Sequence, residues 1–204
     1  FGLLIAGSWK AVAPPEPVLQ GDGLWGPYFD YPGRRKVYVQ WAGPTMVPWD
    51  NMAVNWSILV PPETANRAAA DEDYLAPVEL SFHRRGLSYA KPRRKLIAES
   101  IQIAPHDWPL SGWYGYNDAT RSLAAPAAGT VGDHTLQRIE AFLDWAETAL
   151  PVDPERIVAM GRDGAVMMAL HRPQRVAYAL VNDFDATVLN DDYADALTAA
   201  WGPR

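Results

Sequence analysis

One short segment of the chain combines a carboxylate with the residue types that form a tight turn. Residues 161–165 read Gly-Arg-Asp-Gly-Ala, between an apolar run at 156–160 and a segment of small residues that stops before Pro173. Glycine and alanine allow a strand to turn sharply into a helix, and the first helical turn directs its N–H groups at a side chain placed there. Such N–H groups stabilise either a developing oxyanion or a fixed carboxylate. Both roles are open to Asp163.

The four histidines are the other residues whose charge changes near neutral pH. His106 and Asp107 follow a predicted strand, at the end where open parallel sheets carry their sites. Adjacent strand residues point to opposite faces, however, which argues against a working His–Asp pair. His83 also ends a predicted strand and is expected to make a structural hydrogen bond or to line a pocket. The histidines lack metal-ligand spacing, and the Asp-rich segment lacks the glycine and glutamate of a calcium loop, so the sequence predicts no metal and no cofactor.

Aromatic residues gather in the segment 106–132, which is expected to be a long loop. Loops of this length inside compact domains are frequently functional. The chain has nine tryptophans, most of which core packing or an interface would explain. The loop cluster is the exception, and it predicts a surface for an ester, a sugar or an apolar polymer. The candidate ligand-binding residues are His83, His106, Trp108, Trp113 and Tyr114.

The elements that must position these residues follow from periodicity and from breaker residues. From residue 78 onward, the predicted order is strand, strand, helix, strand, helix, strand, helix, which is typical of a mostly parallel sheet with helices on both faces. Residues 63–77 are predicted as a polar loop, with room for one helical turn. The predicted strands are 35–43, 53–62, 78–83, 100–105, 156–160 and 175–183, and the predicted helices are 133–150, with Asp133 as its cap, 164–171 and 191–201. The predicted division is an N-terminal arm with the first strands at 1–52 and an α/β domain at 53–204.

Composition limits the classes of function. The chain has 204 residues, is 49% hydrophobic and carries a formal net charge of −6, which argues against a general nucleic-acid binder. The absence of cysteine excludes disulfides and thiolate chemistry. No apolar run reaches the roughly 18 residues that a membrane-spanning helix needs. The chain does not begin with an initiator Met, which is expected of either a processed product or a fragment. If the apolar opening is what remains near a cleaved leader, it favours a secreted or periplasmic bacterial protein.

Charge is distributed unevenly along the chain. One basic and one acidic segment stand out, and each is expected to be a solvated face unless the two face each other or a partner chain. The basic residues are Arg84, Arg85, Lys91, Arg93, Arg94 and Lys95, and the acidic residues are Asp183, Asp185, Asp191, Asp192 and Asp195.

The block LDWAETALPVDPERIVAMGRDGAVMMALHRPQRVAYALV, residues 143–181, resembles the α/β-hydrolase superfamily, in its secreted-esterase and dienelactone-hydrolase-like branches. In that family the block is a helix, the strand before the nucleophile, the nucleophile elbow, its helix and the next strand. VELSFHRRG at 78–86 resembles the strand that ends in a His-Gly oxyanion loop, with His83 at the histidine position. IQIAPHDWPLSGWYGYND at 101–118 resembles the next strand with its aromatic loop. The resemblance begins near residue 53 and covers the rest of the chain.

The resemblance places Asp163 where the family has its nucleophilic serine, and it implies oxyanion-hole N–H groups near Arg84 and Gly164. The family's acid and histidine follow the nucleophile in the sequence, yet the last histidine here is His171, on the elbow helix itself. The chain therefore looks like the first two-thirds of the fold, incomplete at its C-terminus.

Three functions remain open on these grounds. The first is a catalytically degenerate protein or subunit that acts through assembly or binding, with a second polypeptide or self-association completing the sheet. The second is an active carboxylic-ester-type hydrolase with Asp163 as the nucleophile and a histidine supplied by a partner chain. The third is a carbohydrate- or polymer-binding module that uses the Trp/Tyr loop.

Overall fold

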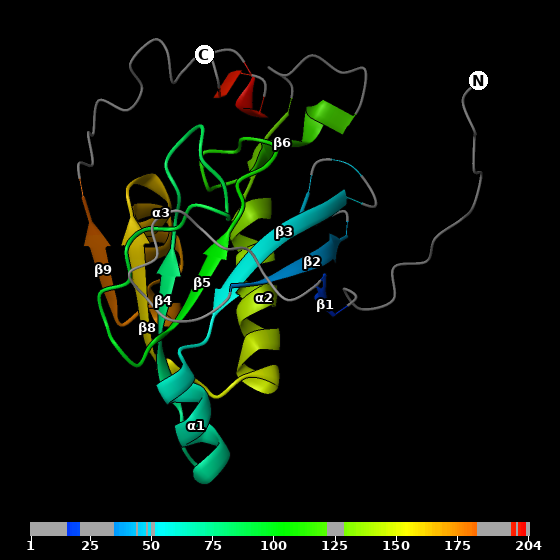
Figure 1. Cartoon of the computed structure of the whole chain (residues 1–204). Coiled ribbons are helices and arrows are strands. Elements are labelled where there is room, and N and C mark those ends of the chain that lie inside the picture. Colours follow the sequence, from blue (N-terminus) through cyan, green and yellow to red (C-terminus); the bar gives the residue numbers. More distant parts are fainter. Residues whose placement is uncertain are drawn as a thin grey trace.

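The computed structural model describes residues 16–20, 35–43, 45–47, 49, 52–121, 129–182, 197–198 and 200–202. Within them, one seven-stranded sheet has the order β1-β2-β3-β5-β4-β8-β9, and β6 pairs with β7 in a small hairpin (Figure 1). The strands are β1 (Val18–Leu19), β2 (Lys36–Ala42), β3 (Met52–Leu59), β4 (Ala76–Ser81), β5 (Ile101–Pro105), β6 (Tyr116–Asn117), β7 (Val131–Gly132), β8 (Val152–Gly161) and β9 (Tyr178–Val181). The helices are α1 (Pro62–Ala70), α2 (His134–Ala149) and α3 (Asp163–His171), with short 3₁₀ turns at Asp118–Arg121 and Pro173–Arg175.

The sheet has an antiparallel half and a parallel half. Strands β1, β2 and β3 run antiparallel to their neighbours, and β3 is also antiparallel to β5. Strands β5, β4, β8 and β9 are parallel, with α2 connecting to β8 and α3 connecting β8 to β9. The alternation predicted from residue 78 onward is thus confirmed through β9. The proposed division at residue 52 stays a prediction, and β2 on one side of it pairs along its full length with β3 on the other.

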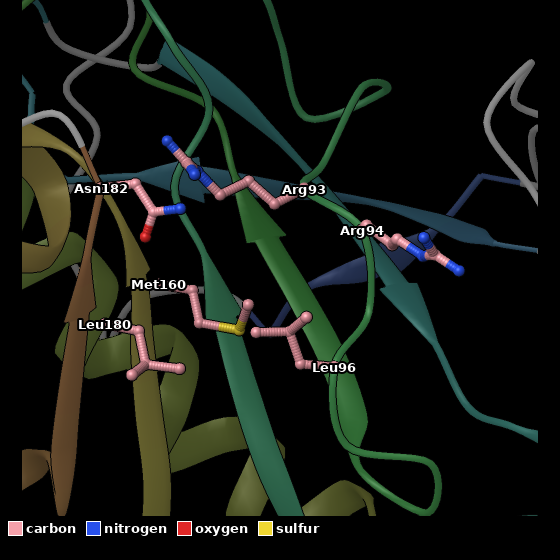
Figure 2. A pocket seen from close by; sticks show the side chains of 6 residues that line it. All are labelled: Arg93, Arg94, Leu96, Met160, Leu180 and Asn182. Atoms are coloured by element: carbon pink, nitrogen blue, oxygen red, sulfur yellow. The ribbon is translucent and has the colours of Figure 1, made fainter.

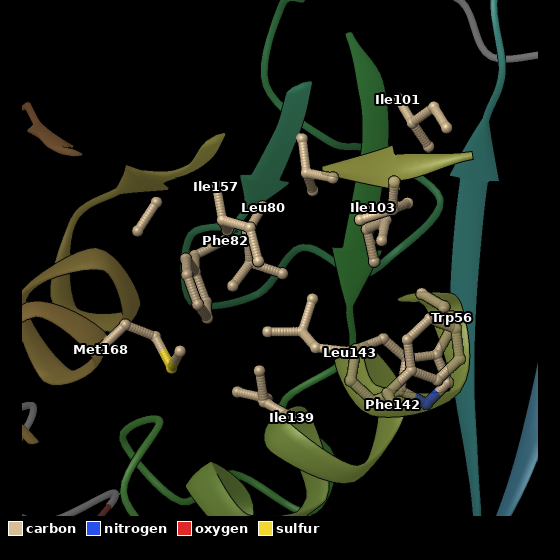
Figure 3. Packing of buried hydrophobic residues seen from close by; sticks show 14 of the residues in the cluster. Trp56, Leu80, Phe82, Ile101, Ile103, Ile139, Phe142, Leu143, Ile157 and Met168 are labelled. Atoms are coloured by element: carbon tan, nitrogen blue, oxygen red, sulfur yellow. The ribbon is translucent and has the colours of Figure 1, made fainter. Parts of the chain in front are cut away.

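The main core lies between the sheet and the helices α2 and α3. Alternate residues of β4, such as Val78 and Leu80, face this side, as the two-residue period of a strand requires. Trp56 of β3 stacks on Phe142 of α2, with ring centroids 3.8 Å apart and an angle of 10° between the rings (Figure 3). Helix α3 contributes Ala165 and Met168 to the same cluster, and Met168 is labelled in Figure 3. Full burial of one such side chain contributes about 1.5–3 kcal/mol, so this face supplies most of the driving force for folding.

The opposite face of the sheet is polar at its centre. Glu79, Ser81 and Gln102 are buried there, and in the described structure residues 84–100 cover this face without forming a helix. Arg35 reaches this centre from the start of β2 and donates hydrogen bonds to Ser57 and Gln102. Burial, opposed by Glu79, lowers the pKa of Arg35 to about 9.

Three local expectations differ from the structure. The predicted polar loop at 63–77 contains helix α1, because Pro62 occupies the first helical turn and alanines follow it. The predicted loop at 106–132 contains the β6–β7 hairpin. Asp133 stands at the N-cap position of α2 but makes no capping bond, since its carboxylate accepts hydrogen bonds from Arg172 and Gln137 instead. In the predicted helix at 191–201, residues 191–196 and 199 lie outside the described residues, and residues 197–198 and 200–201 are helical.

Ion pairs join the end of α3 to α2. Arg172 contacts both Asp133 and Glu140, and Arg175 contacts Asp144 and Glu147. Burial tends to raise the pKa of Asp133, but the hydrogen bonds from Arg172 and Gln137 outweigh it and hold that pKa below its ordinary value. Two helices that share one face of the sheet are thereby also linked at their outer ends.

The turn from β8 into α3 lies directly against the end of β4. Gly161 has a φ of +153°, and a Cβ at this position would lie 2.8 Å from Cβ of Phe82. A Cβ at Gly164 would also lie 2.8 Å from that atom and would overlap the Phe82 ring. The glycines are therefore required by contact with a neighbouring strand, as well as by the backbone conformation at Gly161.

We expect Gly164→Ala to destabilise the fold by about 1–3 kcal/mol, because the new methyl group must displace a buried aromatic ring. Gly43→Ala is the control, since a Cβ at Gly43 meets no atom within 4 Å. Urea unfolding of the two variants measures the difference. Equal unfolding midpoints would show that the β8–α3 turn is looser than this contact implies.

Candidate functional site

The carboxyl ends of β4, β5 and β8 meet at one edge of the sheet, and the chemically interesting residues follow these ends. His83 comes two residues after β4, His106 directly after β5, and Asp163 begins α3 after β8. In open α/β sheets, this edge is where ligands bind.

Asp163 is the first residue of α3 and follows β8 after one intervening residue, Arg162. Its side chain is half-buried, and its Oδ1 atom is shielded from solvent. The left-handed conformation of the turn falls at Gly161, and among the described non-glycine residues only Trp113 has a positive φ. The aspartate thus belongs to the regular start of the helix, where a negative charge is stabilised by about 0.3–1 kcal/mol.

The two oxyanion-hole candidates lie on either side of this position. Gly164 is buried in the first turn of α3, ahead of the first backbone bond of the helix, from Val166 N–H to the Arg162 carbonyl. Arg84 is exposed in the turn after β4, and its carbonyl accepts hydrogen bonds from Leu87 N–H and from His83. Their roles as oxyanion donors stay predictions.

His83 is buried, and both of its ring nitrogens are engaged. Nδ1 donates to the Arg84 carbonyl at 2.8 Å, which leaves Nε2 to accept the N–H of Asp107 at 3.1 Å. Burial lowers the pKa of His83, opposed by its bond to Arg84 and by the charge of Asp107. The imidazole therefore connects two loops in its neutral form.

His106 is a second neutral imidazole at the same edge. Burial lowers its pKa to about 4, and electrostatic interactions with His83 and Arg138 add to this effect. Its ring lies against Tyr89, with centroids 5.2 Å apart, and against Trp108, at 6.5 Å in a stacked arrangement. The His83 and His106 rings are 5.5 Å apart.

Asp107 points away from His106 and supports the aromatic loop. Its carboxylate accepts hydrogen bonds from the N–H groups of Ser111 and Trp113 and from the Ser111 hydroxyl. Burial raises the pKa of Asp107, while the Ser111 bonds and Arg138 oppose the rise. These bonds hold Trp113 at a φ of 65°. The expectation that His106 and Asp107 do not form a working pair agrees with this geometry.

The aromatic candidates separate into three environments. Trp113 is buried and packs edge-on against Phe82 and His83. Trp108 is 64% exposed beside His106. The ring of Tyr114 contacts His171 at the end of α3, with centroids 4.9 Å apart. The structure therefore brings His83, His106 and Trp113 together and places Tyr114 next to a different element.

Two residues at this edge were not predicted from the sequence. Arg138 is buried in α2 and donates to the carbonyls of His106 and Met46, which fixes the end of β5. Tyr89 lies in the segment between β4 and β5 and packs its ring on His106. Arg138 interrupts the apolar face of its helix, and this interruption is the signal that could have identified it. Tyr89 carries no comparable signal.

In the described part of the chain, no three histidine, aspartate or glutamate side chains are grouped as a metal site would require. None of the described helices combines the length and apolar character needed to cross a bilayer.

No protein-family model matches the sequence, and a search of curated proteins finds no match. Solved structures do match. The Staphylococcus aureus fluorophosphonate-binding serine hydrolase FphF has a TM-score of 0.57 at 14% identity, over 85% of this chain and 67% of that one. A ferulic acid esterase has a TM-score of 0.50 at 10% identity, over 85% and 67% of the two chains. A glucuronoyl esterase from Teredinibacter turnerae has a TM-score of 0.51 at 10% identity, over 95% of this chain and 56% of its own.

These identities are low enough that the likeness concerns the fold and not the activity. The matched structures are hydrolases, and the predicted strand, glycine turn, helix and strand are present in this chain as β8, the turn at Gly161, α3 and β9. The chain has the fold of the α/β-hydrolase superfamily.

Proposed function

We propose that this chain is a catalytically degenerate α/β-hydrolase-like protein that acts through assembly or binding. One observation supports the proposal. Asp163, the residue that the resemblance assigns to the nucleophile position, begins helix α3, while the four imidazoles of the chain make other contacts. His83 connects two loops, and His106 is neutral between aromatic rings. His134 lies beside the Gly132 carbonyl, and His171 packs on Tyr114.

The last strand of the described sheet supports an assembly role. All four residues of β9 are exposed, including Tyr178 at 72%, Leu180 at 42% and Val181 at 39%. Parallel strands are normally buried on both faces, and an uncovered apolar edge strand is a template for another strand. A further strand from a second copy or from another polypeptide would cover this edge.

A second function, an ester hydrolase with Asp163 as the nucleophile, has one observation in its favour. The carboxylate lies at a helix N-terminus on the carboxyl edge of the sheet, next to the small residues Gly164 and Ala165. Attack of the Asp163 carboxylate on the acyl carbon of an ester would form a mixed anhydride and release the alcohol, which takes a proton from water. An activated water must then cleave the anhydride, and a partner chain would have to supply the histidine that activates it.

We expect no esterase turnover that depends on Asp163. Short-chain aryl esters assayed with wild type, Asp163→Asn and the exposed control Asp73→Asn should give rates within twofold of one another, both for the isolated chain and for the chain with any co-purifying polypeptide. Turnover that Asp163→Asn abolishes and Asp73→Asn retains would favour the hydrolase instead.

Assembly through β9 predicts a native mass above the 22.5 kDa of one chain. A lysine at Val181 would place a charge on the pairing edge, so Val181→Lys should release the single chain. Leu170→Lys, at an exposed residue of α3, should leave the native mass unchanged. Native mass spectrometry gives the answer, and a wild-type protein that remains a single chain at all concentrations would contradict assembly.

A structural His106 predicts a specific dependence of stability on pH. Its folded pKa, about 4, lies below the ordinary 6.5, so the unfolded chain binds the proton more readily and stability falls as the pH drops from 6.5 to 4. The loss amounts to about 3 kcal/mol at 1.36 kcal/mol per pH unit. His106→Gln should therefore flatten the urea-midpoint profile in this window. If the urea midpoint of His106→Gln falls with pH as steeply as that of the wild type, another group causes the pH dependence.

A further inference from the structure

An apolar cavity of about 270 Å³ lies beside the last two turns of helix α3. Segments from four parts of the chain meet there: the aromatic loop, strand β7, helix α3 and the helical residues 200–201. The residues that line the cavity are Tyr114, Val131, Met167, His171 and Trp201. Of the ligand-binding candidates predicted from the sequence, Tyr114 alone is among them, so this cavity is a different place from the cluster of His83, His106 and Trp113.

The walls of the cavity are held by contacts within the chain. The indole Nε1 of Trp201 donates to the carbonyls of Ser111 and Gly115, at 3.1 and 3.0 Å. The carbonyl of Tyr114 accepts N–H groups from the first turn of α2, and both Tyr114 and Met167 pack against the main core. The lining is therefore in place before a ligand arrives, which lowers the entropic cost of binding.

His171 brings a hydrogen-bonding group to this apolar lining. The residue is exposed, and its ring packs on Tyr114 with centroids 4.9 Å apart. Among the described residues no hydrogen bond engages either ring nitrogen, and the bond from Arg172 goes to the His171 carbonyl. An imidazole offers at least one N–H donor, and the neutral ring also offers an acceptor. A ligand hydroxyl, which both donates and accepts, matches this ring in either tautomer.

Size and lining together select the class of ligand. A cavity of about 150 Å³ holds one benzene molecule, so a cavity of about 270 Å³ has room for two fused rings. Tyr114, His171 and Trp201 surround it with aromatic rings, which gain more from edge-on or offset contact with another flat ring than from an aliphatic chain. The thioether of Met167 also contacts aromatic rings favourably.

We propose that this cavity binds a small bicyclic aromatic molecule that carries a hydroxyl group. The hydroxyl would bond to the His171 imidazole, and the fused rings would lie against Tyr114, Met167 and Trp201. The site uses neither Asp163 nor the outer edge of β9. Ester turnover or a monomeric state would therefore overturn the proposed function without affecting this cavity.

A second, smaller hollow provides an internal control. It lies on the opposite face of the sheet, between residues 93–96 and the strands β8 and β9 (Figure 2), and its volume is about 140 Å³. Because this volume is no larger than that of a cavity for a single benzene ring, we expect it to exclude two fused rings. Met160 and Leu96 line this hollow (Figure 2), whereas Met167 lines the proposed site.

2-Naphthol is the probe, and NMR of the full wild-type chain with isotope-labelled methionine methyl groups locates it. Titration with 2-naphthol should shift the methyl signal of Met167 and leave that of Met160 in place. A Met167 signal that does not move, whether because 2-naphthol fails to bind or because it binds elsewhere, would overturn the proposal. This measurement needs no substitution in the binding site, so it holds even where a variant fails to fold.

Isothermal titration calorimetry tests the role of the hydroxyl group. We expect His171→Leu to weaken 2-naphthol binding about fivefold, the worth of one neutral hydrogen bond, and Leu96→Ala, in the smaller hollow, to change it less than twofold. Naphthalene, which lacks the hydroxyl, should bind the wild type about fivefold more weakly than 2-naphthol and should be insensitive to His171→Leu. Equal affinities of the wild type for the two compounds, or equal losses in the two variants, would overturn the proposal.

Filling the cavity tests its position independently of His171. Val131→Phe adds a ring to the lining and should abolish 2-naphthol binding, while the thermal midpoint shows that the variant is folded. A folded Val131→Phe chain that binds 2-naphthol as tightly as the wild type would place the ligand outside this cavity and overturn the proposal.

Discussion

The contact between Phe82 and the glycines of the β8–α3 turn is the constraint on which the carboxyl edge of the sheet depends. Phe82 directly follows β4, and a Cβ on either Gly161 or Gly164 would come within 2.8 Å of its own Cβ. The Phe82 ring also meets Trp113 edge-on at 4.8 Å, so the same side chain positions the aromatic loop. One buried ring thereby sets the distance between α3, which begins at Asp163, and the loop after β5. Because interiors are close-packed, a displacement at this ring is felt at all three segments.

The two faces of the sheet are stabilised by different means. One is covered by α2 and α3 through an apolar core, and its stability scales with buried area. On the other face Glu79 and Gln102 bind an irregular segment through hydrogen bonds, and Arg35 donates a hydrogen bond to Gln102. A helix satisfies its own backbone, but a loop does not, so a loop that covers a sheet needs polar partners beneath it. Buried Glu79 supplies such partners to two successive N–H groups of the loop.

The sequence alone was enough to predict those helices and strands that are specified by local residue patterns. The apolar period of α2, the glycines before α3 and the β-branched residues of β2 and β3 predicted those segments to within a few residues. It failed where distant partners decide the outcome. Asp133 has the type and position of a helix cap, but Arg172, 39 residues away, binds its carboxylate. Trp113 looks like a loop aromatic available to a ligand, and contact with Phe82 buries it. Neither partner can be recognised from local patterning, because tertiary contacts override local preference.

The protonation states at the carboxyl edge favour a binding role over proton transfer. A general base works best when its pKa lies near the working pH, whereas burial depresses the pKa values of both His83 and His106. The ring nitrogens of His83 are also occupied by a carbonyl and by the N–H of Asp107. The Asp107 carboxylate accepts three hydrogen bonds from the loop that follows it. His83 and Asp107 therefore hold loops in place, and the use of either one in catalysis would release the segment that it holds. These hydrogen bonds give the carboxyl edge of the sheet a fixed shape. A fixed shape is what the binding role that we propose requires.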